Sequence, residues 1–491
     1  MQRSLGWWVL GVMACSASPE VAPAPPPADA GVDAAPRALS ELASLTEIAV
    51  YQVVKVDVMR DGADIVYANA PIVPKRSGIV RAYVSVVPKA WRARKLKAEM
   101  HLFLPQGEVV IADERLIGAT SDDDSLDSTF VFPFPATTFT KAGSVPYYVL
   151  VSDPKLAASG DEIATLRYPA GLDTGLIHVD KSPGSVKLHV VPFEYDADGS
   201  KRVPLTQAPQ LTAIANQMMD LYPASNVTLD VGPVVPWSEP INADGTGWDS
   251  VLEATLNQRA ADGPTSEVYY VGLFSPSASF GQYCKGGCVL GLAPLADATS
   301  ADARGAAVVG FGGYETTETV AHEIGHTMGR AHAPCGGPAG VDPKFPYPDG
   351  SIGVSGFRTS DQALIGSAAA DMMSYCPPEW VSDYTYKALF TRMTYVNTHI
   401  QLTPAPLVHI TRIRVDGDGN IMGATAGVAR EQASGAPISV RFSGGRGADV
   451  VGRMVRYDHL PGGYIVAPEA PAGATHVSVP SLTGRPWKLA R

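Results

Sequence analysis

The chain has 491 residues, of which 45% are hydrophobic and 18% are charged, and its formal net charge at pH 7 is −11. This length exceeds one ordinary domain and suggests about three. The acidic balance argues against a nucleic-acid partner, which would require a basic surface. The 48 glycines and 41 prolines predict many turns and a loop-rich β content.

Residues 1–15 have the pattern of a lipoprotein signal peptide. Arg3 gives a positive start, and residues 5–14 form an apolar run that is too short to span a bilayer but long enough for a signal-peptide core. The run ends in "VMAC", which resembles a bacterial lipobox, with cleavage before Cys15 and lipid attachment to its thiol. An ordinary signal peptide with an incidental Cys15 is the alternative. The favoured interpretation is an exported protein, lipid-anchored to the cell envelope at the outer membrane or the cell surface.

Two further regions follow the signal. Residues 16–45 begin with an Ala/Pro-rich stretch that cannot form a core, and they are predicted to be a tether with partial polyproline II stiffness. Residues 46–185 contain short β-like runs separated by turn clusters, which predicts an antiparallel β-sandwich. These runs are 48–58, 78–87, 98–104, 128–134 and 146–152. The sandwich shows no catalytic constellation and is interpreted as a spacer, a pro-domain-like cover or a substrate-recruiting module.

The pattern changes over residues 186–400. Strand-like runs at 186–195, 227–234, 267–275 and 305–313 alternate with helical patterns at 206–223 and 247–262. Such alternation predicts an α/β unit with a mixed sheet. Residues 401–491 return to β-like runs and are predicted to form a C-terminal β domain. The expected class is therefore a multidomain α+β protein.

The segment "TTETVAHEIGHTMGRAHAPCGG" from residue 316 has the spacing of a metal centre. His322 and His326 are four apart, so a helix places both on one face, where they can bind one Zn²⁺. Glu323 projects beside the metal and can take a proton from water and pass it to the leaving amine. Gly329 allows a left-handed turn that returns His332 as a third ligand. Three protein ligands and one water are typical of a catalytic zinc site.

This segment resembles the metzincin signature, "HExxHxxGxxH" followed by a Met-turn. The likeness is tight over 316–376 and looser over 186–400. In "DMMSYC" Met373 fits the Met-turn, with Met372 as the alternative. In astacin-like and serralysin-like families a tyrosine two residues beyond that Met can ligate the metal and stabilise the oxyanion, and the resemblance gives this role to Tyr375. The pairing of "HAPCGG" with "MSYC" is similar to exported bacterial metzincins, some of which cut glycoproteins.

Four cysteines remain besides Cys15, and an even number in an exported chain predicts two disulfides. Cys284 and Cys288 are close enough for a local clip. Cys335 and Cys376 would then close a longer loop and tie the His332 segment to the Met-turn. A cysteine zinc site and a free thiol are the alternatives.

Three further patterns in the sequence are weaker indications of structure or function. The run at 305–313 is either an edge strand at the rim of the cleft, which would pair with extended substrate, or a plain core strand. "DGDGN" at 416–420 is predicted to be a hairpin turn rather than a calcium loop. The remaining histidines are interpreted as structural or surface residues: His101, His178, His189, His399, His409, His459 and His476.

The sequence therefore predicts a zinc-dependent endopeptidase that hydrolyses peptide bonds of proteins or glycoproteins, with Glu323 as general base. The alternative is a surface-anchored adhesin or glycan-binding protein built on a degenerate protease fold. Glu323 argues against this alternative, because a structural zinc site does not need that carboxylate.

Overall fold

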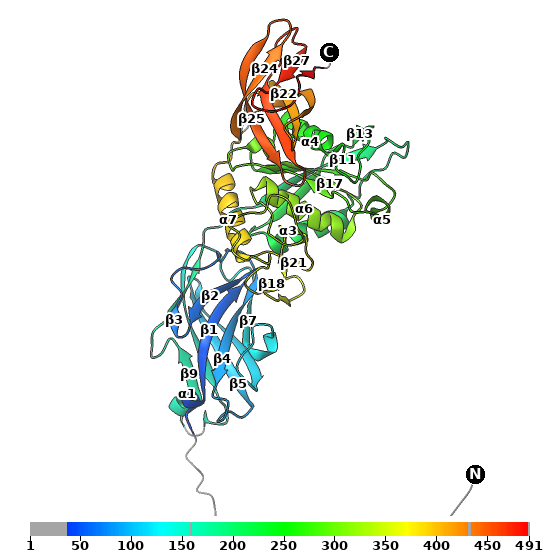
Figure 1. Cartoon of the computed structure of the whole chain (residues 1–491). Helices are drawn as coiled ribbons and strands as arrows, with labels where there is room; N and C mark the ends of the chain where they lie inside the picture. Colours follow the sequence, from blue (N-terminus) through cyan, green and yellow to red (C-terminus); the bar gives the residue numbers. More distant parts are fainter. Residues whose placement is uncertain (1–36, 158–159, 431–433, 490–491) are drawn as a thin grey trace, which may run out of the picture.

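The computed structural model describes residues 37–157, 160–430 and 434–489. The predicted signal peptide, Cys15 and most of the tether lie outside the described residues. The described part is mostly β, with several sheets and few helices, and Figure 1 shows two β domains on either side of a central part that holds most of the helices. None of the helices in these ranges has both the length and the apolar character needed to span a membrane.

The N-terminal domain consists of two antiparallel sheets. One has the order β3 (Ala63–Asp64), β2 (Lys55–Arg60), β1 (Ala43–Tyr51), β4 (Gly78–Val86) and β7 (Phe130–Phe134). The other has the order β10 (Gly175–Val179), β8 (Gly143–Ser152), β5 (Arg94–Leu104) and β6 (Gly107–Ile117), with β9 (Thr165–Tyr168) beside β8. Alternate residues of β5 and β8 are buried, as expected of strands that cover a core with one face.

This domain begins earlier than the sequence predicts. Residues 39–45 lie within the predicted tether, but they form α1 (Leu39–Leu42) and the start of β1. Leu39 and Leu42 are buried in the core of the domain, and burial of these leucines stabilises the ordered start.

The central part contains a mixed sheet in the order β12 (Val227–Val231), β11 (Val186–Tyr195), β14 (Val268–Phe274), β17 (Gly305–Val309) and β15 (Gly291–Leu292). The first four are parallel and β15 is antiparallel, while β13 (Val235–Trp237) also pairs with β11. Helices α3 (Ala208–Leu221) and α6 (Gly313–Thr327) share one core with Val190, and α4 (Trp248–Asp262) shares another with Val191. Because neighbouring strand residues face opposite ways, the helices cover both faces of the sheet.

The run at 305–313 is a core strand and not an edge strand. β17 pairs with β14 on one side and β15 on the other, and all five of its residues are buried. Its small side chains fit between helices on both faces, and the strand ends at Val309. The edge position belongs to β15, which has only two residues and therefore gives no strand pattern in the sequence.

Helix α7 (Asp383–Thr398) leads to the C-terminal domain, and the Ser382 side chain caps its start by accepting a bond from Thr385 N. The C-terminal sheet has the order β23 (Ile421–Ala429), β22 (Val408–Asp416), β26 (Gly462–Pro468), β25 (Ala448–Tyr457), β24 (Ala436–Ser443), β27 (His476–Ser478) and β28 (Trp487–Lys488). Residues 416–420 form the turn between β22 and β23, as predicted. β16 (Pro294–Leu295) of the central part pairs with β25, so one sheet crosses the domain boundary.

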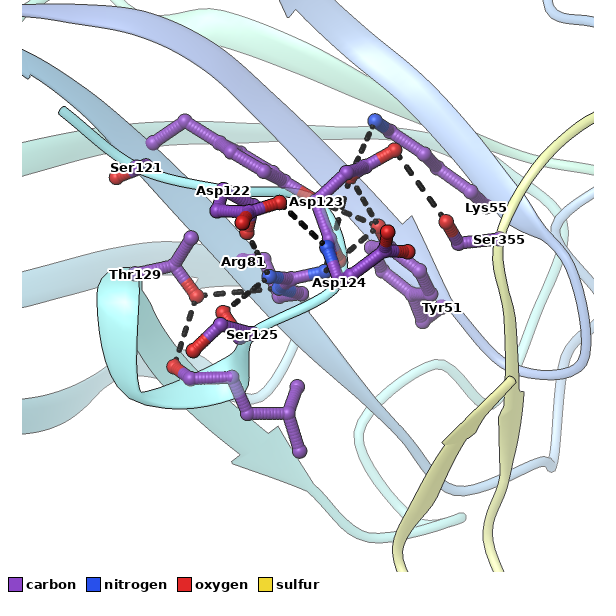
Figure 2. Close-up of polar contacts among 12 residues, drawn as sticks. Tyr51, Lys55, Arg81, Ser121, Asp122, Asp123, Asp124, Ser125, Thr129 and Ser355 are labelled. Carbon is purple, nitrogen blue, oxygen red and sulfur yellow. Dashed lines mark hydrogen bonds and ion pairs between the residues drawn. The ribbon is translucent and has the colours of Figure 1, made fainter. Parts of the chain in front are cut away.

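The N-terminal domain contacts the central part around Ser355. Lys55 N donates to Ser355 O over 2.8 Å, and Trp380 Nε1 donates to Val53 O over 2.9 Å. Figure 2 shows the polar cluster at this contact, in which Asp123 accepts bonds from the Ser355 hydroxyl (3.3 Å) and from Lys55 Nζ (2.8 Å). The contact therefore fixes the segment of the chain that connects His332 to the predicted Met-turn.

Arg81 fixes the loop that carries Asp123. Its side chain is fully buried, and Figure 2 shows it surrounded by this loop and by Tyr51. The guanidinium donates to the Tyr51 hydroxyl, to Thr129 Oγ1 and to the main-chain carbonyls of residues 122, 123 and 125. A buried cation is stable only when its donors are satisfied in this way.

Candidate metal centre

Helix α6 carries the first two candidate ligands. At its start Thr316 Oγ1 accepts a hydrogen bond from Gly312 N (2.9 Å) and donates one to Val309 O (3.0 Å). These bonds satisfy groups that a helix start leaves unpaired and join the helix to the end of β17. His322 and His326 then lie one turn apart, and both are buried.

The end of α6 brings the third candidate into reach. Gly329 has φ of 83°, a left-handed conformation that glycine adopts at little cost. Arg330 N bonds back to Gly325 O over 3.0 Å, which closes the turn. The chain reverses there, and the His332 ring lies 4.6 Å from the His326 ring between centroids.

The three rings are held in the same way. Each directs Nδ1 at a main-chain carbonyl: His322 at Met372 O (2.7 Å), His326 at Arg330 O (2.6 Å) and His332 at Ala339 O (2.5 Å). A carbonyl can only accept, so Nδ1 carries the proton and Nε2 carries the lone pair. Bonds of this kind fix the tautomer and orientation of metal-binding histidines.

The chemistry of this set fits a metal ion. His322 Nε2 and His326 Nε2 are 2.9 Å apart, and two lone pairs at this distance require a cation near both. Burial lowers the pKa of His322, His326 and His332, so the rings are neutral at pH 7, which is the form that binds metal.

Glu323 lies beside these rings and is fully buried. Neither of its carboxylate oxygens has a hydrogen-bond partner within the described part of the chain. Burial, and then the nearby charge of Asp458, raise the pKa of Glu323. Gly291 of β15 packs directly on this carboxylate, and a Cβ atom at residue 291 would collide with it. The edge strand therefore defines one wall of the position that Glu323 occupies.

A cleft of about 440 Å³ opens over Glu323 and His322. Residues 288–291 of the central part form one wall, and Thr319, Ser374 and Tyr375 contribute to the others. No residue of the N-terminal domain, within its described ranges, lines this cleft. The pro-domain-like cover considered for that domain is therefore not seen at this cleft.

The predicted Met-turn lies beneath the rings. Met372 and Met373 are both buried, and the Met373 sulfur lies under Gly325 of α6. Ala333 N donates to Met373 O over 2.9 Å and Tyr375 N donates to Cys335 O over 3.0 Å, so the two segments run together.

Both predicted cysteine pairs form disulfides in the structure. Cys335 and Cys376 have a Cα–Cα distance of 5.7 Å, within the usual range for a disulfide. Cys284 and Cys288, in the loop before β15, have a Cα–Cα distance of 5.0 Å. The first bond ties the segment after His332 to the segment after Met373, and the second shapes the loop at the cleft wall.

Tyr375 stands at the opening of the site. Its hydroxyl lies 3.3 Å from His332 Nε2, and its side chain is half-exposed. The ring faces the His459 ring nearly in parallel, with 5.5 Å between centroids.

The structure places His459, which the sequence interpretation gave as a structural or surface residue, among the candidate metal ligands. The His459 ring lies 5.0–5.4 Å from the rings of His322, His326 and His332, and its Nδ1 is 2.5 Å from Asp458 Oδ2. Asp458 is fully buried, and its Oδ2 is 3.4 Å from His326 Nε2. One nitrogen of each of the four histidines lies within 4.8 Å of the others. The pair follows β25 more than 120 residues after His332, and no spacing rule connects it to the motif.

Two further carboxyl groups, those of Glu318 and Glu379, line the cleft. Glu318 is one helical turn before His322, and Glu379 lies three residues after Cys376. Burial, and then the neighbouring Glu318, raise the pKa of Glu379 well above its ordinary value. These acidic groups were not singled out in the sequence, because they lie 61 positions apart.

Comparison with known proteins agrees with this geometry. The protein-family model described as Peptidase M66 matches residues 237–379, a stretch that contains α6, the three histidines and the two methionines. The match supports a metallopeptidase. It ends before Asp458 and His459, which lie outside the matched residues.

The other comparisons add little. No curated protein matches the chain. Among solved structures, a calcium-binding mutant of β-glucuronidase 2 from Bacteroides uniformis matches 42% of this chain at 11% identity and a TM-score of 0.13. The match spans 27% of that protein, and so low a score carries no argument about fold or function.

Proposed function

We propose that this chain is an exported zinc endopeptidase of the metzincin type, with His322, His326 and His332 as zinc ligands. One observation carries the proposal: three buried imidazoles present Nε2 lone pairs to one point, with the Glu323 carboxylate beside them. When bound, zinc supplies Lewis acidity, which polarises a scissile carbonyl and lowers the pKa of water.

The residues of the chain would supply the remaining chemistry. Glu323 accepts a proton from the attacking water and delivers it to the leaving amine. The Tyr375 hydroxyl, which faces His332 Nε2, donates a hydrogen bond to the developing oxyanion. Among the described residues β15 is the last strand of its sheet and lies beside Glu323, so an extended substrate can add there as a further strand. The substrates are proteins or glycoproteins, and the lipid anchor at Cys15 would keep the enzyme at the cell envelope.

The substitution Glu323→Gln tests the proposal. The amide cannot accept the proton, so hydrolysis of a generic protein substrate should fall about 10²–10⁴-fold while one zinc per chain is retained. Zinc content measured on the same samples separates loss of the base from loss of the metal. A Glu323→Gln enzyme with more than about half of the wild-type rate would show that Glu323 is not the base.

A further inference from the structure

We propose that His459 of the C-terminal domain is a fourth metal-binding residue and that Asp458 is the carboxylate that orients it. This inference rests on the proposed metal centre. It concerns residues outside the segment that the Peptidase M66 model matches.

The Nδ1 atom of His459, like that of each of the three predicted ligands, lies within hydrogen-bonding distance of an oxygen atom. In each of those, an oxygen acceptor holds Nδ1 and leaves the lone pair on Nε2. In His459 the acceptor is Asp458 Oδ2, at 2.5 Å. A carboxylate on the distal nitrogen of a metal-binding histidine is a common arrangement, and it raises the basicity of the ligand.

Asp458 and His459 lie in the turn between β25 and β26, and backbone pairing across the domain boundary fixes the position of this turn. Pro294 of β16 pairs with Tyr457 of β25, the residue before Asp458. Asp458 N then donates to Ala293 O (3.2 Å), and Ala293 N donates to Asp458 Oδ1 (2.9 Å). The turn between β25 and β26 is only four residues long, 458–461, so it has little freedom to leave this position.

The surroundings of the turn are not those of a core histidine. His459 lies among three imidazoles, Tyr375 and the Glu323 carboxylate, whose Oε1 is 3.5 Å from His459 Nδ1. Asp458 Oδ2 also faces His326 Nε2, which carries a lone pair. Collecting these groups in a buried place is costly unless a cation binds among them.

A fourth imidazole has a consequence for catalysis. Catalytic zinc sites keep a position open for water, sometimes by expanding to five ligands. If His459 binds the metal, its imidazole would compete with water and substrate for such a position.

Metal binding, rather than activity, tests the inference. The full-length wild type and the variants His459→Ala, Asp458→Asn and His409→Ala would be stripped of metal and titrated with Zn²⁺ against a chelating indicator. His459→Ala should weaken zinc binding at least 10-fold, and Asp458→Asn by a smaller factor, because the amide still accepts from Ala293 N but orients the ring less well. His409 is exposed on β22 of the same domain, and its removal should change nothing.

Spectroscopy provides a second readout that does not depend on variants. The ligand-field spectrum of the Co²⁺-loaded wild type should differ from that of His459→Ala, and X-ray absorption of the zinc-loaded wild type should show four imidazole nitrogens. Three imidazoles in the wild type, or a folded His459→Ala protein with unchanged zinc affinity and Co²⁺ spectrum, would overturn the inference. His326→Ala should lose zinc in either case, so zinc retained by that variant would instead contradict the proposed function.

Discussion

The two β domains contact the central part in different ways. The N-terminal domain binds the outside of the segment around Ser355 through Asp123 and Lys55, and none of its described residues reaches the cleft. The C-terminal domain extends its sheet with β16 and places Asp458 and His459 among the candidate ligands. One domain supports the chain that carries the site, and the other contributes side chains to it.

This difference predicts opposite behaviour on substitution. Changes in the N-terminal domain should alter stability and leave metal binding intact, whereas changes in the β25–β26 turn should alter metal binding directly. Four variants with changes outside that turn test how far this separation holds.

The largest effect is expected for Arg81→Met. Methionine leaves five acceptors without their donor in a buried place, which should cost about 3–5 kcal/mol of unfolding free energy. Thermal unfolding should therefore begin at lower temperature, while the zinc affinity of the folded protein stays at the wild-type value. Arg441→Met is the matched control, because Arg441 is exposed on the C-terminal domain. This substitution should lower the unfolding free energy by less than about 0.5 kcal/mol. A large loss of zinc affinity in Arg81→Met would show that the N-terminal domain also shapes the centre.

A smaller loss of stability is expected when Cys335 and Cys376 are both changed to alanine. Their bond spans 41 positions, and loop-closure entropy attributes about 2–4 kcal/mol to such a bond. Zinc binding should also weaken, because the segment after His332 loses its tie to the Met373 segment, and excess zinc should restore part of the activity. The bond between Cys284 and Cys288 spans only 4 positions, so the corresponding double variant should lose less stability. Equal losses in the two double variants would contradict the loop-length argument.

The part of the site that the sequence could predict consists of residues close together along the chain. His322, Glu323 and His326 follow one another along a helix, and His332 follows a turn that Gly329 signals, so local geometry brings these residues together. Helices α3 and α4 likewise follow from apolar residues at helical spacing.

The missed features depend on contacts between distant segments. His459 reaches the site only because β25 pairs with β16, and a single sequence does not reveal that pairing. β15 is too short to give a strand pattern, and the core position of β17 depends on its two neighbours. β6 was not predicted because it includes the consecutive charged residues 113–115 and only Ile117 of its residues is buried.

A third prediction concerns β15, the strand next to the contact with the C-terminal domain. In Gly291→Ala the new methyl group collides with Glu323 and displaces the carboxylate, and a displacement of about 1 Å can reduce the rate about 100-fold. Zinc content should not change, because the three atoms nearest to the added methyl group all belong to Glu323 and not to a ligand ring. Gly286→Ala in the preceding loop is the control, since nothing lies within 4 Å of its added atom. If both variants keep the wild-type rate, β15 does not position Glu323.

The smallest effect is expected for Glu379→Gln, at the wall of the cleft nearest the N-terminal contact. Burial and Glu318 raise the pKa of Glu379 in the folded protein, so the folded state holds this proton more tightly than the unfolded state does. The contribution of Glu379 to the unfolding free energy of the wild type is therefore fully present below the unfolded pKa of about 4.5. This contribution is lost as the pH rises toward the folded pKa, by at most about 1.4 kcal/mol per pH unit. Glutamine stays neutral at every pH, so the unfolding free energy of the variant, relative to that of the wild type, should increase between pH 5 and pH 8. Denaturant unfolding at several pH values measures this difference, with Glu469→Gln at an exposed position as the control. A difference that does not change with pH would mean that Glu379 is ionised in the folded protein and that the cleft wall carries its full negative charge.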